Sequence, residues 1–502
     1  MNKKLREYWE NNTLLVIMIC AAILRLIAAI FAKGYAMNDD HFVIIHVAQR
    51  WLDGYDDWFN KDHPSGFSLV YTGLHYILFY LLKSIGITDP VVKMYIVRFI
   101  HAVYSLLTVY FGYKITLLLS NKKMAAQVGI MLATFWLMPF MSVRNLIEMV
   151  CIPPMMAGFY YVLKGEQSDN RKYWILAGLL FGLAFSIRYQ TILIPGGVGL
   201  ILLFRKDWQR FGYFTIGTIA GLFVVQGVVD WIFWGFPFAA FMQYAFYNVE
   251  YRYDYISGPW YRYILLILGV LIPPTSISLS YGFLRTLKKY AILFWPVMIF
   301  LIFHSLYPNK QERFILPILP MLLLLGTVGW QQFVTNSGFW GSKIKTLKVS
   351  HIWFWTLNTI LMVTLLFTFS KKTMIEPLVY LSKQEDVNAA IVEYNRAGMP
   401  WFPLYYLGRK IPMYRISKDY DANEVLSVMK TRNDFPPEYV FFFGQEDLQE
   451  RVFNMEKLLA VDLRQEQRFD PSLIDWLLHK MNPKHNLNLT SYIYRVIPDG
   501  ND

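Results

Sequence analysis

The sequence of 502 residues has only two cysteines, few charged residues and no glycine pattern typical of nucleotide binding. Cys20 and Cys151 both lie in apolar segments, which excludes a disulfide framework and a paired-cysteine metal site. Neither GxGxxG nor GxxxxGK[ST] occurs, so a soluble nucleotide substrate has no recognisable binding loop. Charged residues make up 17% of the chain, against about 25% in an ordinary soluble protein. These absences argue against a soluble, nucleotide-dependent or disulfide-stabilised protein.

Hydrophobic residues, by contrast, make up 55% of the sequence and aromatic residues 18%, and many of them fall in long runs. Such runs predict an α-helical polytopic membrane protein. The first run, Leu14 to Phe31, is not followed by a small-residue cleavage site, so we expect a retained anchor. The net charge of +12 comes from small basic clusters between apolar runs, which favours a membrane partner over nucleic acid.

The basic clusters also predict how the chain is oriented in the membrane. Lys3, Lys4 and Arg6 place the N-terminus in the cytoplasm, and five later clusters agree if Gly66–Leu82 dips into the outer leaflet without crossing it. About eleven transmembrane helices result, and their odd number places the C-terminal part outside. The expected spans are 12–32, 95–119, 124–141, 148–164, 174–188, 191–204, 211–231, 263–284, 291–306, 314–333 and 351–370.

A change of composition near residue 375 predicts two domains. Residues 1–374 are expected to form the transmembrane catalytic domain, with long external loops at 33–94 and 232–262. Residues 375–502 are expected to form a small extracytoplasmic α/β domain, which is long enough to hold its own core. The pattern there favours a helix over Ser382–Asn395 and strands over Tyr439–Phe443 and Ser491–Ile497.

The first candidate site follows the first span, at Asn38-Asp39-Asp40-His41-Phe42. Carboxylates so close to a membrane are costly unless they are used or well hydrated, so we hypothesise that one of the two aspartates is a catalytic base. His41 and the more distant His63, in Asp62-His63-Pro64, are candidate substrate contacts. Both stretches are also typical helix starts, and that structural role is the alternative.

The second candidate site is the loop from Asp230 to Tyr263, which is rich in tryptophan and tyrosine. Aromatic residues gather at membrane interfaces for structural reasons, which accounts for part of this enrichment. Polar residues lie among the rings, and flat apolar faces beside hydrogen-bonding groups suit a sugar ring or a prenyl chain. The candidate substrate-binding residues here are Asp230, Asn248, Trp260 and Tyr261.

Cations at span ends form the third candidate site. Lys310 and Arg313 lie outside, where the positive-inside rule disfavours them. A lipid-linked phosphate would give them a partner, and bulk lipid headgroups are the alternative. Arg188 is a further candidate phosphate ligand, and Arg144 and Glu148 are candidate substrate contacts. Acids, cations and aromatic rings on one face fit the transfer of a sugar from a lipid phosphate to a hydroxyl.

These stretches resemble glycosyltransferase family 22, the membrane mannosyltransferases of GPI-anchor and N-glycan assembly. Lys310-Gln-Glu-Arg313-Phe314-Ile-Leu-Pro317 is similar to the family motif HKExRFxxP, with Asn309 where the family has His. Other similar stretches are Asn145-x-x-Glu148 (NSxE), Asn38 to Phe42 (PDEHF-like), Ala177 to Thr191 with Arg188, and the loop motifs between Asp230 and Tyr263. The resemblance covers about residues 12–330 and implies the C-type glycosyltransferase fold.

The resemblance implies an inverting enzyme that moves a sugar, expected to be mannose, from a polyprenyl-phosphate donor to a lipid-linked glycan or glycolipid hydroxyl. Asp39 would accept the hydroxyl proton, with Asp40 beside it. Lys310, Arg313 and Arg188 would stabilise the departing phosphate. No cofactor is expected, and a metal is left open. The expected location is the bacterial inner membrane, with the active site on the extracytoplasmic side.

Two alternatives remain open at this point. Asp62-His63-Pro64 resembles protein O-mannosyltransferases and lipid A aminoarabinose transferases, which use other acceptors. A lipid-glycan flippase or transporter is the non-enzymatic alternative, because charges within membranes also mark transport paths. The odd number of expected spans and the lack of paired halves argue against a secondary transporter.

Overall fold

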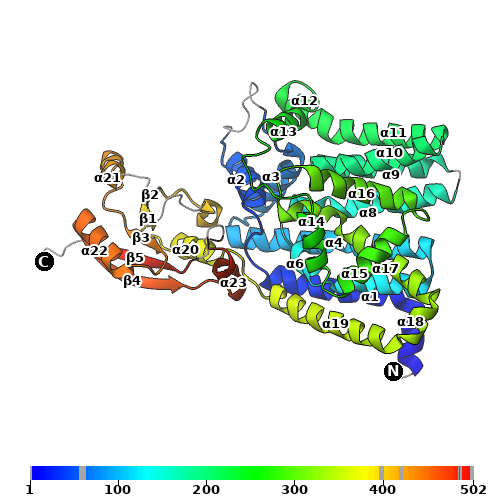
Figure 1. Ribbon diagram of the computed structural model, residues 1–502. Helices are drawn as coiled ribbons and strands as arrows, with labels where there is room; N and C mark the ends of the chain where they lie inside the picture. The colour runs from blue at the N-terminus through cyan, green and yellow to red at the C-terminus, as the bar shows by residue number, and fades with distance from the viewer. Residues whose placement is uncertain are drawn as a thin grey trace. The chain divides into compact units, whose positions relative to one another are not determined.

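The computed structural model describes residues 3–55, 64–168, 170–394, 401–417, 422–483, 486 and 489–497. Up to residue 366 the described chain forms helices joined by short connections (Figure 1). In chain order these are α1 (Lys3–Phe31), α2 (His46–Leu52), α3 (Leu69–Ser84), α4 (Pro90–Leu119), α5 (Lys122–Thr134), α6 (Leu137–Ser142), α7 (Ile147–Val150), α8 (Ile152–Glu166), α9 (Arg171–Ile187), α10 (Leu193–Phe204), α11 (Trp208–Leu222), α12 (Val228–Trp234), α13 (Ala239–Glu250), α14 (Arg262–Val270), α15 (Thr275–Arg285), α16 (Ala291–Leu306), α17 (Leu319–Thr335), α18 (Gly338–Ser342) and α19 (Ile344–Leu366).

The rest of the described chain forms a mixed five-stranded sheet with flanking helices. Its elements are α20 (Lys372–Ser382), β1 (Ala390–Tyr394), β2 (Met413–Ser417), α21 (Ala422–Thr431), β3 (Tyr439–Phe443), α22 (Leu448–Leu459), β4 (Asp462–Phe469), α23 (Leu473–Met481) and β5 (Ser491–Ile497). The strand order is β2-β1-β3-β5-β4, with β1 parallel to β2 and β3, and β5 antiparallel to β3 and β4. The parallel pairs require crossover connections, and α21 lies in the one between β2 and β3.

The chain divides into two compact units. The helical unit comprises residues 1–30, 50–77 and 97–367, and the sheet unit comprises 31–49, 78–96 and 368–502. This division differs from the boundary expected at 374/375, because two N-terminal segments belong to the sheet unit. A change of composition cannot reveal such long-range contacts, since they form only in the folded chain.

Among the described residues, five helices are long and apolar enough to cross a bilayer. They are Trp9–Phe31, Pro90–Leu119, Trp208–Trp234, Glu312–Thr335 and Ile344–Leu366. A sixth span results if α14 and α15, which bend by 116° at their junction, are counted together. The eleven spans expected from the sequence are therefore not confirmed, and the sidedness of the chain stays a prediction.

Helix breaks explain much of this difference. The expected span 124–141 ends as α5 at Thr134, because the backbone N–H of Trp136 donates to the Asn358 side chain (2.8 Å) and the helix does not continue. The expected span 191–204 is α10, with only 12 residues. At 1.5 Å per residue such a helix covers little more than half of a hydrocarbon core of about 30 Å.

The helix α9, which ends at the candidate residue Arg188, packs unusually closely against α11. Gly178 and Gly182 on α9 face Gly217 and Gly221 on α11, and a Cβ added to Gly182 would lie 2.6 Å from the carbonyl carbon of Gly221. Small residues spaced four apart allow such backbone contact between helices in membranes. Figure 1 shows α9, α10 and α11 side by side, and this packing fixes the end of α9, where Arg188 follows.

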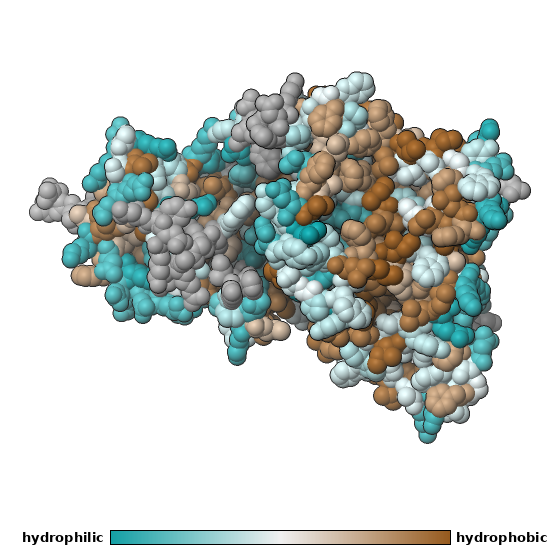
Figure 2. Space-filling view, turned by 45° about the horizontal axis from the view of Figure 1, so that its top comes forward, coloured by the Kyte–Doolittle hydropathy of each residue, from teal (hydrophilic) through white to brown (hydrophobic). Residues whose placement is uncertain are grey.

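The surface of the helical unit is rich in exposed hydrophobic side chains, visible as brown areas in Figure 2. Leu15 and Ile23 on α1 are 51% and 52% exposed, and Ile216 and Ile219 on α11 are both 60% exposed. Large contiguous apolar surfaces are rare on soluble monomers and suit contact with lipid. Together with the apolar helices, they identify an integral membrane protein.

The sheet unit contains the strands predicted at Tyr439–Phe443 and Ser491–Ile497, as β3 and β5. The helix predicted over Ser382–Asn395 is wrong, because α20 ends at Ser382 and β1 occupies Ala390–Tyr394. The short apolar run in β1 is compatible with helix or strand, and its pairing between β2 and β3 decides for the strand.

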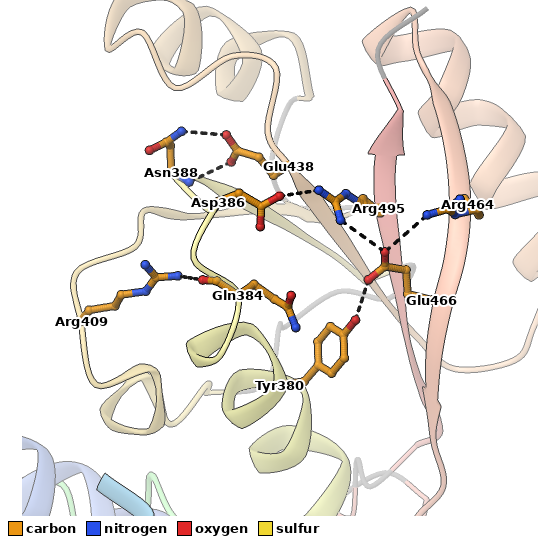
Figure 3. A network of polar contacts seen from close by, with 9 residues as sticks. All are labelled: Tyr380, Gln384, Asp386, Asn388, Arg409, Glu438, Arg464, Glu466 and Arg495. Atoms are coloured by element: carbon orange, nitrogen blue, oxygen red, sulfur yellow. Dashed lines mark hydrogen bonds and ion pairs between the residues drawn. The ribbon is translucent and has the colours of Figure 1, made fainter. Parts of the chain in front are cut away.

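A polar network joins α20 to the sheet (Figure 3). The hydroxyl of Tyr380 donates to Glu466 (2.6 Å), whose carboxylate also lies 3.8 Å from Arg464 and 3.9 Å from Arg495. Arg495 pairs in turn with Asp386. Glu466 occupies a β-bulge, which redirects its side chain toward Tyr380. The remaining bonds in this view join Asn388 to Glu438 and Arg409 to Gln384.

Candidate active site

The candidate site in the helical unit is centred on Glu148, a fully buried carboxylate on the short helix α7. Its Oε1 lies 3.2 Å from Nη2 of Arg188 and 3.5 Å from Nε of Arg313. Within the described part of the chain, neither oxygen of Glu148 makes a hydrogen bond of good geometry. The carboxylate therefore attracts each guanidinium group by charge, without a hydrogen bond of good geometry to either.

The local backbone explains why these three side chains converge. Glu148 follows the extended residue Leu146, at which the chain turns from α6 into α7. Arg188 is the extended residue that ends α9, and Arg313 lies in a 3₁₀ turn before α17. All three charges thus lie where the chain leaves one helix for another, and side chains from separate segments can meet there.

Neighbouring side chains hold the two arginines in place. The guanidinium of Arg188 lies over the ring of Phe314 (5.0 Å), and Nε of Arg313 donates to Oε1 of Gln311 (2.9 Å). Two guanidinium groups thus lie beside the carboxylate of Glu148. Arginine binds phosphate through paired hydrogen bonds, so the arrangement suits a phosphate-bearing ligand.

Arg144 lies in the same turn as this cluster, four residues before Glu148. It is only 1% exposed, and its guanidinium lies over the ring of Phe140 (4.3 Å). The substrate contact predicted for Arg144 would require this buried side chain to face a cavity that the ligand can enter.

Lys310 has a different environment from the one that the sequence suggests. It is 1% exposed, and its ammonium donates to the carbonyl groups of His304 and Ser305 (both 2.7 Å) and of Tyr307. These carbonyls belong to the end of α16, so Lys310 caps this helix. Burial, and to a smaller extent Arg262, lower the pKa of the Lys310 ammonium. Phosphate binding by Lys310 stays a prediction, and its observed bonds favour a structural role.

The aromatic loop is tied to the segment that carries Lys310. Ser257 forms an isolated antiparallel bridge with Asn309, and the backbone N–H of Lys310 donates to the carbonyl of Ile256 (2.8 Å). Side chains extend this contact, with Tyr263 donating to the Gln311 carbonyl (3.0 Å) and Arg262 pairing with Glu312 (2.5 Å). The aromatic loop and the segment that carries Lys310 therefore form one local structure, as expected for parts of one site.

The predicted substrate residues of this loop fall into two groups. Trp260 and Tyr261 are exposed, at 61% and 46%. Asp230 is fully buried and accepts from Nε2 of Gln226 (2.8 Å) and from the backbone N–H of Ala240 (3.1 Å), which joins α12 to α13. The two aromatic residues are thus exposed, whereas the bonds of Asp230 favour a structural role, and substrate binding by all three stays a prediction.

Asn248, the fourth predicted residue of the loop, is bonded to neighbouring groups. Its Nδ2 donates to the carbonyl of Tyr244 (2.8 Å), and its own carbonyl accepts from the hydroxyl of Tyr307. The second bond joins α13 to the end of α16, so Asn248 also helps to hold the aromatic loop in place.

The two predicted catalytic aspartates lie in the sheet unit. Asp39 is exposed, whereas Asp40 begins a π-helical turn and is 4% exposed. His41 is stacked between the rings of Tyr35 (4.7 Å) and Tyr406 (5.5 Å). Burial, and then His46, lower the pKa of His41 to about 3, so its ring is neutral at pH 7. Of the two aspartates, Asp39 is thus the one exposed at the surface of the sheet unit, and the catalytic role of either stays a prediction.

His63 lies outside the described residues. In the ranges that the structure describes, no group of three or more His, Cys, Asp or Glu residues is placed to hold a metal ion.

Sequence reasoning missed the residues that support the cluster. Gln311 and Phe314 fix the two arginines. Tyr71 contacts Asn145 in the turn before Glu148, and His101 in turn contacts Tyr71. Gln311 and Phe314 lie within Lys310–Pro317, the stretch that resembles the family motif, so the sequence does point to them. Tyr71 and His101 lie in separate apolar helices, where sequence spacing gives no indication of contact.

A model of the Alg9-like mannosyltransferase family matches residues 16–396. The chain is 26% identical over 336 residues to GPI alpha-1,2-mannosyltransferase 3 of Bos taurus, covering 62% of this chain and 58% of the relative. The Homo sapiens protein of the same name is 24% identical over 334 residues, covering 63% and 57%. The chain thus spans less than two thirds of the length of these relatives.

Solved structures share the fold at low sequence identity. ArnT from Cupriavidus metallidurans, bound to undecaprenyl phosphate, aligns with a TM-score of 0.59 and 12% identity, covering 96% of this chain and 98% of ArnT. The Archaeoglobus fulgidus oligosaccharyltransferase aligns with a TM-score of 0.53 and 12% identity, covering 88% and 69%. These structural neighbours have the C-type glycosyltransferase fold expected from the sequence.

Proposed function

Since the chain belongs to the Alg9-like mannosyltransferase family, we propose that it is a membrane mannosyltransferase. Its donor is a polyprenyl-phosphate mannose, its acceptor is a hydroxyl of a glycolipid or lipid-linked glycan, and the anomeric configuration is inverted. The relatives named for GPI mannosyl transfer and the neighbour bound to undecaprenyl phosphate support this choice of lipid substrates. A glycolipid acceptor is favoured over a protein because the named relatives act on GPI.

The observation that carries the proposal is the cluster of Glu148, Arg188 and Arg313. Its two guanidinium groups, 3.2 and 3.5 Å from Glu148, suit a site that binds an anionic phosphate. A lipid phosphate would accept hydrogen bonds from the two arginines. Because both charges are buried, their interaction with phosphate is weakly screened by water and salt.

The reaction needs a base, a nucleophile and a stabilised leaving group. The acceptor oxygen attacks the anomeric carbon of mannose, and the carboxylate of Asp39 takes the hydroxyl proton. The bond from the anomeric carbon to the phosphate oxygen breaks, and its electron pair stays on the departing polyprenyl phosphate. Arg188 and Arg313 stabilise this developing charge, which is the role of preorganised cations in such reactions.

Asp39 is favoured over Asp40 because it is exposed, while Asp40 is 4% exposed. The exposed rings of Trp260 and Tyr261 offer flat surfaces for a sugar or a prenyl chain. We place the active site and residues 375–502 on the extracytoplasmic side of a bacterial inner membrane.

The test is transfer by the purified full-length protein. Polyprenyl-phosphate mannose is incubated with a panel of glycolipid, lipid-linked glycan and peptide acceptors, and the products are identified by mass spectrometry. A mannosylated glycolipid or lipid-linked glycan is expected. Transfer to peptide only would indicate a protein O-mannosyltransferase, transfer of aminoarabinose to lipid A would indicate that branch, and lipid movement without transfer would indicate a flippase.

A further inference from the structure

A buried polar network lies beside the candidate site in the helical unit. The hydroxyl of Tyr71 on α3 is 2.6 Å from Nε2 of His101 on α4 and donates to Oδ1 of Asn145 (2.6 Å). Tyr71 is 4% exposed and His101 6%. Asn145 lies in the turn that leads from α6 to α7, three residues before Glu148.

The far ends of this network are fixed by backbone carbonyls. Nδ1 of His75 is 2.9 Å from the Tyr71 carbonyl, and Nδ1 of His101 is 2.7 Å from the Val97 carbonyl. A carbonyl oxygen only accepts, so both imidazoles carry a hydrogen on Nδ1 and each neutral ring presents Nε2 as an acceptor. The two rings stack at 6.0 Å, which holds α3 against α4.

Asn145 is oriented by Tyr71 on α3. Its Oδ1 accepts from the Tyr71 hydroxyl, so the amide oxygen, and not the amide nitrogen, faces Tyr71.

The phenol of Tyr71 has one hydrogen and two acceptors, Asn145 and His101. The bond to Asn145 is the one that reaches the candidate site, and His101 competes for the same hydrogen. Removing the phenol oxygen breaks both contacts, whereas replacing His101 by an apolar ring leaves the hydrogen to Asn145.

The turn that holds Asn145 is rigidly joined to Glu148. The carbonyl of Leu146 accepts from the backbone N–H groups of Met149 (2.8 Å) and Val150 (3.0 Å), which closes α7 around Glu148. A displacement of Asn145 is therefore transmitted to Glu148 through a single helical turn.

We propose that Tyr71 is a positioning residue, which holds Asn145 and thereby sets the place of Glu148 between Arg188 and Arg313. The role assigned to the cluster rests on the proposed function, but the mechanical link does not. Tyr71 touches neither donor nor acceptor, and it acts through Asn145.

The first test is a thermal melting cycle that needs no substrate. Tyr71→Phe, Glu148→Gln and the double variant are compared as purified full-length proteins. Because the two residues act through one turn, the double variant is expected to melt about 2 °C higher than the sum of the single losses predicts. The cycle of Tyr290→Phe with Glu148→Gln is the control and should be additive, since the Tyr290 hydroxyl bonds the distant Leu119 carbonyl (3.0 Å).

The second test separates positioning from general damage by kinetics with polyprenyl-phosphate mannose. Tyr71→Phe and Asn145→Ala should each raise the donor KM about tenfold, the effect of one lost buried hydrogen bond, with kcat within about twofold. The double variant should be no worse than either, and His101→Phe should be milder.

Each outcome decides the matter. An additive melting cycle, or an unchanged donor KM in Tyr71→Phe, overturns the proposal. A coupled cycle in a protein that transfers no mannose keeps the positioning link and rejects the proposed function. If Tyr71→Phe and Tyr290→Phe had equal effects in the melting cycles with Glu148→Gln, Tyr71 would be an ordinary packing residue.

Discussion

Each unit of the molecule has a buried glutamate–arginine pair, and the two pairs differ in how completely they are bonded. Glu148 in the helical unit lies 3.2 and 3.5 Å from its two arginines, without a hydrogen bond of good geometry in the described chain. Glu393 in the sheet unit receives hydrogen bonds from both Nε and Nη2 of Arg451, the former at 3.0 and 3.2 Å.

The remaining donors of Arg451 are also used. Nη1 donates to the carbonyls of Gly444 and Glu446 (both 3.1 Å), and Nη2 donates to that of Phe443 (2.9 Å). These groups lie at the end of β3, so the arginine holds the connection from β3 to α22 to the neighbouring strand β1. Burial raises the pKa of Glu393, and Arg451 opposes this shift.

The comparison teaches how to separate a structural ion pair from a binding site. A charge pair whose hydrogen-bonding capacity is filled stabilises the fold and has nothing left for a ligand. The carboxylate of Glu148 lies at longer distance from its two arginines, and neither of its oxygens makes a hydrogen bond of good geometry in the described chain. The proposed donor site therefore lies in the helical unit and does not include Glu393 or Arg451.

The largest effect is expected when the saturated pair is broken. Arg451→Ala leaves Glu393 and three carbonyls without their partner, so the free energy of unfolding should fall by about 3–5 kcal/mol. Denaturant melts of the full-length protein measure this loss. The exposed pair Arg468–Asp470 is the control, and Arg468→Ala should cost less than about 1 kcal/mol. A loss of donor affinity in a folded Arg451→Ala protein would contradict the division of roles.

The next largest effect concerns the base in the sheet unit. Asp39→Asn keeps the size of the side chain and removes the base, so kcat should fall by roughly 10² or more while donor binding is retained. Asp40→Asn is the matched control, and the buried Asp40 should give the milder loss under saturating donor and acceptor. The assignment reverses if Asp40→Asn is the inactive variant, and near-normal turnover in both would remove the base from this loop.

A smaller, pH-dependent effect is expected at His41. Its folded pKa of about 3 lies below the ordinary value of 6.5, so below pH 6.5 the unfolded chain binds a proton that the folded chain does not. Stability should therefore be complete above pH 6.5 and fall by about 1.4 kcal/mol per pH unit as the pH drops toward 3. Melting curves of the wild type and of His41→Phe measure this slope, and an equal slope in both would show that another group causes it.

The sequence predicts much of the helical character and two of the strands, but not where long apolar runs break. The break between α5 and α6 depends on Asn358, which lies 222 residues from Trp136 in the chain. Likewise β1 is a strand because β2 and β3 pair with it, and a helix fits the same residues when they are read alone.

In the candidate site, too, the sequence predicts some features and not others. Glu148, Arg188 and Arg313 stand out in the sequence because charges beside apolar spans are costly, and the structure brings all three together. Lys310 stands out for the same reason, yet its three bonds to carbonyls of α16 depend on a chain reversal that charge alone does not reveal. Residue type and spacing identify candidate residues. Only the folded structure distinguishes a residue that is placed to bind a ligand from one that caps a helix.

The central claim, that the arginines held by Glu148 bind the donor phosphate, is tested most directly by equilibrium binding of polyprenyl-phosphate mannose. Arg188→Ala and Arg313→Ala should each weaken the Kd roughly 10- to 100-fold, the range for a charge-assisted hydrogen bond of about 1.5–3 kcal/mol. Lys310→Met is the matched control, and as a helix cap it should change the Kd less than about threefold. Wild-type affinity in both arginine variants would contradict the claim, and a loss confined to Lys310→Met would transfer the phosphate site to that lysine.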